Sequence, residues 1–339
     1  MERIYPEQST RDREAWLSLL KEQGLRPVSG IPIYGIFREG QLVATGAIDG
    51  DILKCIAVSD EEKGGATLHE LISGLLSLVY EQGPRTVFVY TKPAAVGAFR
   101  ALGFHEIERG TPQPVFMENR ASFPVYLANL QEGAFPTAQK IGAIVLNANP
   151  LTRGHLSLIQ RALEEVEALY LFIVSEDRSA FSTKDRKRWL LRAVRDDSRI
   201  QVRETGPYLI SSQTFPNYFL REDSQQTEVQ AGLDARIFAL HIAPALGIRY
   251  RFVGEEPFSA STNTYNRVMD RVFQQVGEVT LRILPRLRSD GIAISASAVR
   301  KNCTEGNFDA MEKVLPDFVF QDLKQGRYEH RSSMSTEGR

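Results

Sequence analysis

The most informative segment of the chain is Asn147-Ala148-Asn149-Pro150-Leu151-Thr152-Arg153-Gly154-His155. An apolar run, Ile141 to Leu146, comes before it, and apolar residues follow at helical spacing: Leu156, Ile159, Ala162, Leu163 and Val166. A buried strand, a tight polar loop and a helix start therefore meet at Gly154 and His155. In an α/β sheet such a junction presents backbone N–H groups and a helix dipole to a phosphate chain.

Outward from this point the chain alternates strand and helix patterns. Strands are predicted at Ile141–Leu146, Leu169–Val174, Arg199–Arg203, Ile248–Val253 and Val279–Leu284. Helices are predicted at His155–Val166, Lys184–Val194, Glu228–Leu246, Tyr265–Val276 and Asn307–Gln325. This alternation predicts a Rossmann-like, doubly wound parallel sheet over residues 138–327. The polar end, residues 328–339, is expected to be a disordered tail.

Residues 1–110 predict a separate α+β domain. Its expected helices are Glu14–Leu25, Thr67–Tyr80 and Ala94–Leu102, and its expected strands are Ile33–Phe37, Leu42–Gly46, Ile52–Val58, Thr86–Tyr90 and Phe104–Ile107. Residues 111–137 contain Pro112, Pro114, Pro124 and Pro136 without a sustained period, which predicts a connector.

Composition excludes several classes of function. With 41 basic and 42 acidic residues the net charge is −1, which gives no bulk attraction to nucleic acid or to a membrane. The longest mostly apolar run, Leu71 to Tyr80, is too short to span a bilayer, and no secretory signal is visible. Two cysteines, Cys55 and Cys303, form no disulfide framework, so we expect a cytoplasmic protein. No His, Cys or Asp cluster has zinc-ligand spacing, so no structural metal is predicted.

A second polar segment, Ile294-Ser295-Ala296-Ser297-Ala298-Val299-Arg300, follows the last predicted strand. Two hydroxyls and a guanidinium at a helix start suit the far end of a triphosphate. Each motif alone also fits an ordinary capped helix, with Thr152 or a serine as the cap. The two together, at either end of one β-α array, favour a nucleotide site.

These residues resemble the nucleotidyltransferase superfamily, whose members join a nucleoside triphosphate to a second substrate and release pyrophosphate. Longer strings resemble the citrate lyase ligase family over about Ile141 to Gln325. They are Leu146 to His155, Gly206-Pro207-Tyr208-Leu209-Ile210-Ser211-Ser212 with Thr214-Phe215-Pro216, and Val253-Gly254-Glu255-Glu256-Pro257-Phe258 with Thr264-Tyr265-Asn266.

The resemblance implies ATP-dependent acetylation of citrate lyase with acetate, through acetyl-adenylate, with release of AMP and pyrophosphate. It implies ATP with Mg²⁺, and as partner the acyl-carrier subunit of citrate lyase with its phosphoribosyl dephospho-CoA thiol. His155, Arg300 and Thr152 are the expected catalytic residues. The expected nucleotide-binding residues are Asn147, Asn149, Gly154, Gly254, Glu255, Ser295, Ser297 and Val299.

The N-terminal domain resembles the GNAT acetyltransferase fold. Ile56-Ala57-Val58 leads into Glu61-Glu62-Lys63-Gly64-Gly65-Ala66 and then a helix, where GNAT proteins hold the CoA pyrophosphate. The family's usual first residue in that loop is Gln or Arg, and here it is Glu61. This difference weakens the case for acetyl-CoA binding. Three roles of the domain stay open: it holds the CoA-like arm of the carrier, it carries out the second half-reaction, or it is a retained fold without catalysis.

Two other functions stay open. One is an adenylyltransferase of coenzyme biosynthesis, and the other is a GNAT-type acetyltransferase with an accessory nucleotide-binding domain. Ser175-Glu176-Asp177 follows the second strand of the array and fits either a ligand contact or a solvated loop. A basic set on one helix could reach phosphates, but we expect it to form a charged outer face: Lys184, Arg186, Lys187 and Arg188.

Overall fold

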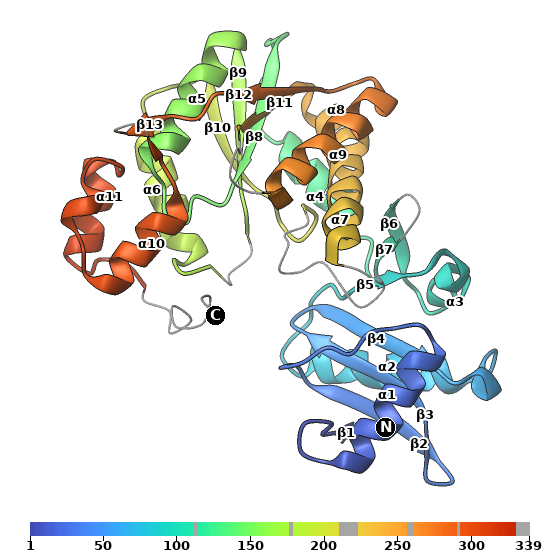
Figure 1. The fold of residues 1–339 in the computed structure, drawn as a ribbon. Helices are drawn as coiled ribbons and strands as arrows, with labels where there is room; N and C mark the ends of the chain where they lie inside the picture. The colour runs from blue at the N-terminus through green and yellow to red at the C-terminus, as the bar shows by residue number, and fades with distance from the viewer. Residues whose placement is uncertain (111–113, 176–178, 210–222, 256–259, 290–291, 330–339) are drawn as a thin grey trace. The chain divides into compact units, whose positions relative to one another are not determined.

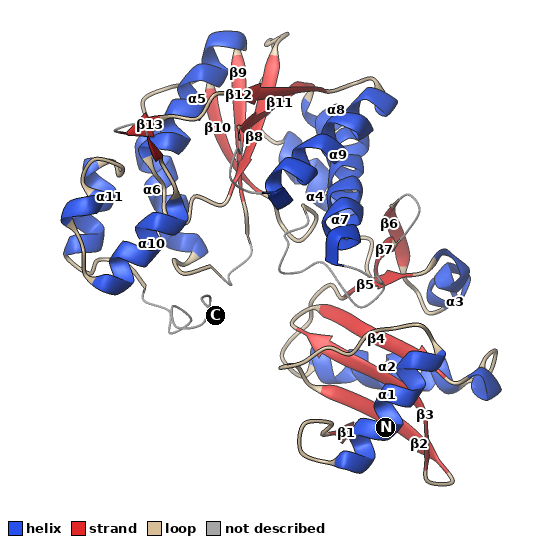
Figure 2. Ribbon diagram, in the orientation of Figure 1, coloured by secondary structure: helices blue, strands red, loops and turns tan. Residues whose placement is uncertain are grey.

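The computed structural model describes residues 1–110, 114–175, 179–209, 223–255, 260–289 and 292–329 of the 339-residue chain (Figure 1). The chain divides into two compact units. The first comprises Met1–Val125 and Thr214–Leu233, and the second comprises Tyr126–Gln213 and Asp234–Arg339. Each unit has its own main sheet with helices packed on it (Figure 2).

The first unit contains a seven-stranded mixed sheet in the order β1-β2-β3-β4-β5-β7-β6. Its strands are β1 (Glu2–Ile4), β2 (Ile33–Arg38), β3 (Gln41–Asp49), β4 (Ile52–Val58), β5 (Phe88–Thr91), β6 (His105–Arg109) and β7 (Val115–Glu118). Neighbouring strands are antiparallel except β4 and β5, which are parallel and pair at Ile52–Phe88 and Leu53–Val89. The helices are α1 (Thr10–Glu22), α2 (Thr67–Tyr80) and α3 (Val96–Ala101).

A bulge in β4 shifts which face of the sheet its side chains reach. Cys55 has a φ of +51°. Between the pairs Ala47–Lys54 and Thr45–Ala57, β4 contains one residue more than β3, which is the mark of a β-bulge. Leu53 consequently packs in the core beneath α2 and α3, whereas Cys55 and Ala57 pack in the core beneath α1. The α/β/α layering agrees with the expected GNAT-like fold.

The expectation of an irregular connector over residues 111–137 was wrong in part. β7 lies in this interval and pairs with β5 and β6, and α4 (Phe123–Gln131) follows it. The prolines in this interval made regular structure look unfavourable. Pro114 and Pro124, however, lie only at the starts of β7 and α4, where a missing N–H is tolerated. We therefore propose that the first domain runs at least through Glu118 rather than ending at residue 110.

The second unit contains a five-stranded, wholly parallel sheet in the order β10-β9-β8-β11-β12, as expected for a doubly wound domain. Its strands are β8 (Ile141–Leu146), β9 (Ala168–Ile173), β10 (Ile200–Glu204), β11 (Ile248–Gly254) and β12 (Thr280–Leu284). A small antiparallel pair, β13 (Arg288–Ser289) and β14 (Ile292–Ala293), follows. The chain leaves β8 toward β9 on one side and returns to β11 on the other, so the topological switch point lies between β8 and β11.

Helices cover both faces of this sheet. One face packs against side chains of α5 (Arg153–Glu165), α6 (Thr183–Val194), α10 (Ala296–Glu305) and α11 (Asp317–Lys324). On the other face Phe238 lies between Phe172 of β9 and Phe273 of α9 (Ala260–Val276), with ring centroids 6.4 and 6.0 Å apart. Among the helices that the structure describes, none is long and apolar enough to cross a membrane.

Two predicted helices are interrupted. The helix expected at 228–246 consists of α7 (Asp223–Ile237), one π-helical turn (Phe238–Ile242) and α8 (Ala243–Leu246). The helix expected at 307–325 is only a 3₁₀ turn (Asp309–Met311) followed by α11, because Pro316 cannot continue a helix.

The expected disordered tail begins too early. Tyr328 packs on Phe181 with ring centroids 5.3 Å apart, and the Glu329 N–H donates to Asp185 Oδ2 at 2.9 Å. The rest of the expected tail, residues 330–339, lies outside the described residues.

Candidate functional site

The loop from β8 into α5 is closed by a capping box. The Thr152 hydroxyl accepts from the His155 N–H at 3.4 Å, and the Thr152 N–H donates to His155 Nδ1 at 3.0 Å. The helix consequently begins at Arg153, two residues before the expected start. Thr152 is only 2% exposed, and its hydroxyl accepts the capping hydrogen bond from the His155 N–H.

The capping box also determines the form of the His155 ring. Because Nδ1 accepts the Thr152 N–H, the ring proton resides on Nε2. Loss of solvation around the ring, with a smaller effect from the Arg286 guanidinium, lowers the pKa of His155 to about 4. At neutral pH His155 is thus an uncharged donor held in one orientation at a helix N-terminus.

The two asparagines brace the loop through their side-chain oxygens. Asn147 Oδ1 accepts from Arg186 Nη1 at 2.7 Å and from Ser179 Oγ at 3.2 Å. Asn149 Oδ1 accepts from the Phe181 N–H at 3.1 Å. Asn147 is exposed, whereas Asn149 is 8% exposed. Both therefore shape the floor of the loop, and of the two only Asn147 presents its side chain to solvent.

Ala148, between the asparagines, has an unusual backbone conformation. Its φ is +47° and its side chain is 1% exposed. A non-glycine residue in the left-handed region is strained, and such residues gather at functional sites. The sequence contains no signal for it, because alanine rarely adopts this conformation.

The second motif meets the first directly. Arg300, on α10, donates from Nη1 to the backbone oxygen of Asn149 at 2.8 Å, across 151 positions of sequence. It also donates from Nη2 to Ser297 Oγ at 2.9 Å. Ser295 is the N-cap of α10, with no side-chain capping bond, so its hydroxyl is not used to start the helix.

Gly154 lies beside the second motif as well. A Cβ placed on Gly154 would be 3.5 Å from Cβ of Ile294 and 3.5 Å from Oγ1 of Thr152, which are ordinary contacts. Packing within the protein therefore does not require a glycine in this first turn of α5.

The Val299 side chain packs in the protein core. It is 1% exposed and belongs to the core of the second unit. The sequence places an apolar residue beside Ser297 and Arg300, and the helical turn directs it inward while they stay at the surface.

Gly254 and Glu255 extend the site across the switch point. The parallel register pairs Arg251 with Ala143, so Gly254 is level with Leu146 at the ends of β11 and β8. A Cβ on Gly254 would meet nothing within 4 Å, and Glu255 is exposed. Residues 256–259, which include the Glu256-Pro257-Phe258 part of that motif, lie outside the described residues, whereas its Thr264-Tyr265-Asn266 part lies in α9. Most of the motif that continues from Gly206 to Pro216 also lies outside the described residues.

Arg186 does not belong to the outer charged face that the sequence predicts for it, because it is fully buried. Its guanidinium donates to the Asn147 backbone oxygen (2.9 Å), the Val174 backbone oxygen (3.0 Å), the Phe181 backbone oxygen (3.1 Å) and Thr183 Oγ1 (2.8 Å), besides Asn147 Oδ1. The sequence spacing could have indicated this burial, because Arg186 lies on the same helix face as the apolar residues Trp189 and Leu190.

The other three basic residues of that set behave as expected. Lys184 pairs with Glu329 at 3.3 Å, Lys187 pairs with Glu204, and Arg188 pairs with Asp185 at 2.9 Å. Ser175 bridges the ends of β9 and β10 by accepting the Gly206 N–H at 3.0 Å, and its neighbours Glu176 and Asp177 are not described. Among the described residues there is no group of three or more His, Cys, Asp or Glu side chains that could hold a metal ion.

Residues 141–323 match the citrate lyase ligase C-terminal domain family. The citrate (pro-3S)-lyase ligase of Haemophilus influenzae is 36% identical over 293 residues, which cover 85% of this chain and 88% of that protein.

Solved structures are similar to each part of the chain. A pantothenate synthetase from Thermus thermophilus is 18% identical, with a TM-score of 0.38, over 54% of this chain and 69% of that one. An acyl-CoA N-acyltransferase from Pseudomonas aeruginosa is 16% identical, with a TM-score of 0.30, over 35% of this chain and 97% of that one. The family match and the length of the shared sequence lead to one conclusion: this chain belongs to the citrate lyase ligase family.

Proposed function

We propose that this chain activates citrate lyase by acetylating the thiol of its carrier subunit, using acetate and ATP. The observation that carries the proposal is the Arg300–Asn149 bond, which joins the two phosphate-type motifs at the switch point of a parallel sheet. Family membership supplies the identity of the protein acted upon.

The chemistry proceeds in two transfers. An acetate oxygen attacks the α-phosphorus of ATP, and the bond from that phosphorus to the bridging oxygen breaks to release pyrophosphate. The carrier thiol, as it loses its proton, then attacks the acetyl carbon, and the bond to the AMP oxygen breaks. An adenylate is needed because acetate itself would have to expel oxide, whereas AMP is a good leaving group.

His155 and Arg300 stabilise negative charge on the phosphates in the first transfer. The neutral His155 ring donates from Nε2, and its orientation is preset by the capping box. Arg300 brings a guanidinium to the same loop, and Ser295 and Ser297 add hydroxyl donors at the start of α10. The N-termini of α5 and α10 contribute their dipoles to the same anion.

The nucleotide is expected to lie across the ends of β8 and β11. Asn147 and Gly154 border its phosphates, and Gly254 and Glu255 border the adenosine. Mg²⁺ enters as part of the ATP substrate, bound by its phosphates. We place the reaction in the cytoplasm, where ATP is available and the two cysteines stay reduced.

We assign the chemistry to the second unit and carrier binding to the first. In the first unit the loop expected to cradle a CoA-like pyrophosphate begins with three consecutive carboxylates, Asp60, Glu61 and Glu62. Lys63 of this loop pairs with Asp60. This charge pattern repels a polyanion and does not favour catalysis at this loop, so our assignment of a docking role to this domain rests on its GNAT-like fold and not on these carboxylates.

Product analysis tests the proposal. Incubation with ATP, acetate and deacetylated citrate lyase carrier should yield free AMP, pyrophosphate and acetyl-carrier in equal amounts. A dinucleotide product would instead identify an adenylyltransferase. Acetylation from acetyl-CoA without use of ATP would identify a GNAT-type acetyltransferase.

Gly154→Ala should separate stability from nucleotide binding. The new methyl makes only ordinary contacts, and alanine in a helix is more favourable than glycine by up to about 1 kcal/mol, so the urea midpoint should hold or rise. The KM for ATP should nevertheless increase, because the methyl occupies the approach of the phosphates. Gly97→Ala in α3 is the matched control and should leave this KM unchanged. An unaltered KM in Gly154→Ala would place the phosphates elsewhere.

Arg300→Lys tests the guanidinium. Lysine keeps the charge but cannot reach Asn149 and Ser297 with a planar fork. Acetate-dependent exchange of pyrophosphate into ATP should fall by about tenfold to a hundredfold, on the scale of partly losing one preorganised donor. Arg161→Lys, on the exposed face of α5, is the control. Equal exchange in both variants would remove Arg300 from the triphosphate site.

The state of His155 can be measured by ¹⁵N NMR of its ring. We expect the Nε2–H form at pH 7 and no protonation until well below pH 6, since the folded pKa is about 4. Because the unfolded ring titrates near 6.5, this residue contributes stability that is complete above that pH and is lost as the pH falls toward 4. A ring that carries its proton on Nδ1, or that titrates above pH 6, would contradict the neutral-donor role.

A further inference from the structure

The loop after β8, which we propose binds the nucleotide, is hydrogen-bonded to α6 and to the segment that leads into it. Asn149 Oδ1 accepts from the Phe181 N–H, and Asn147 is held by Arg186. Phe181 is fully buried and contacts Trp189 of α6 with ring centroids 5.4 Å apart. The position of Asn149, and of the carbonyl that Arg300 bonds, therefore depends on where Phe181 lies.

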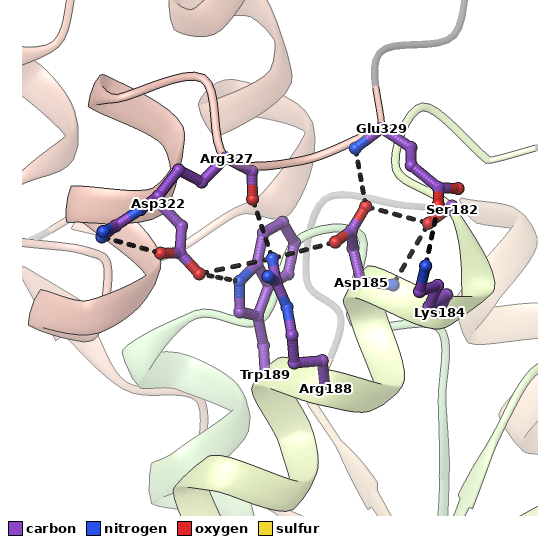
Figure 3. A network of polar contacts seen from close by, with 8 residues as sticks. All are labelled: Ser182, Lys184, Asp185, Arg188, Trp189, Asp322, Arg327 and Glu329. Atoms are coloured by element: carbon purple, nitrogen blue, oxygen red, sulfur yellow. Dashed lines mark hydrogen bonds and ion pairs between the residues drawn. The ribbon is translucent and has the colours of Figure 1, made fainter.

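Residues after α11 hold this segment in turn. We call Arg327–Glu329 the C-terminal clasp. The Tyr328 ring packs edge-to-face on Phe181, at 5.3 Å and 72°. The Glu329 N–H donates to Asp185 Oδ2 at 2.9 Å, and the Arg327 carbonyl accepts from Arg188 Nη2 at 2.8 Å (Figure 3).

Two nearly buried carboxylates fix the clasp against α6. Asp185 and Asp322 are 5% and 6% exposed. Arg188 lies between them, 2.9 Å from Asp185 and 3.4 Å from Asp322, and Trp189 Nε1 donates to Asp322 at 2.9 Å (Figure 3). Arg327 pairs with Asp322 at 3.0 Å. Buried carboxylates compensated in this way have little freedom to shift, so the clasp is a defined part of the fold.

We propose that Tyr328 is a positioning residue for the nucleotide site, acting through Phe181 on Asn149. The inference rests on the proposed ATP-dependent function. Removing the ring opens a cavity beside Phe181, into which the segment 179–182 relaxes. That movement displaces the Phe181 N–H, and with it Asn149 and the Arg300 contact. The clasp lies beyond the family match, which ends at residue 323.

The test compares paired variants at two clasp positions. Tyr328→Ala removes the ring, and Tyr328→Phe restores it. Glu329→Pro deletes the N–H that Asp185 accepts, and Glu329→Ala keeps that N–H while removing only the exposed Lys184 pair. Phe318→Ala removes another aromatic contact between α11 and α6, at Arg192 on the last turn, away from the loop.

Tyr328→Ala and Glu329→Pro should raise the KM for ATP in pyrophosphate exchange by about tenfold, the scale of a sub-ångström misplacement of binding groups. Their kcat should change by less than about twofold, because saturating ATP restores the loop. Tyr328→Phe, Glu329→Ala and Phe318→Ala should keep the wild-type KM, even where the urea midpoint falls. A merely structural Tyr328 would lower stability without this selective change in KM.

Hydrogen exchange gives a readout that does not depend on activity. The Phe181 amide should lose protection in Tyr328→Ala and keep it in Phe318→Ala. Unchanged protection, or an unchanged KM in both Tyr328→Ala and Glu329→Pro, overturns the proposal. A wild-type protein with no acetate-dependent exchange would instead refute the proposed function, and the Phe181 amide would still decide the question of the clasp.

Discussion

The site depends on the hydrogen bonds that the buried Arg186 guanidinium makes to the loop after β8. Taking a charge out of water costs several kcal/mol unless its donors are satisfied, and here they meet acceptors on the ends of β8 and β9 and at the start of α6. The same bonds fix the polar loop that follows β8. In the proposed site, this bonding would hold the loop in place before a ligand arrives and lower the entropic cost of binding a phosphate chain.

The topology of the sheet adds the second half of the site. The strand order reverses between β8 and β11, and in open α/β sheets ligands bind beyond the carboxyl ends of the strands at such a point. The chain then returns with α10, whose Arg300 bonds the Asn149 carbonyl. In the proposed site, one anion would be met by two helix N-termini and a guanidinium, with His155 as a neutral donor. This arrangement concentrates positive potential locally, and the chain's net charge stays close to zero.

Much of this was predictable from the sequence, and the failures have physical causes. Gly154, His155, Ser297 and Arg300 were placed at helix starts because strand and helix periods change there. The inward position of the Val299 side chain was not predicted, because a motif does not tell which of its residues the helix turns inward. β7 was missed because its four residues stand among prolines. The neutral form of His155 depends on burial and on the Thr152 N–H, and neither can be read from spacing.

The order of strands and helices, the parallel sheet, the two phosphate motifs and the resemblance to citrate lyase ligases could all be read from the amino-acid sequence. They follow from local periodicity and local turn chemistry, which act over a few residues. Folding in three dimensions was needed to bury Arg186 beneath the loop, to bring Arg300 to Asn149, and to pack Tyr328 on Phe181. Such contacts join residues up to 151 positions apart, and only the packed sheet and helices bring them within bonding distance.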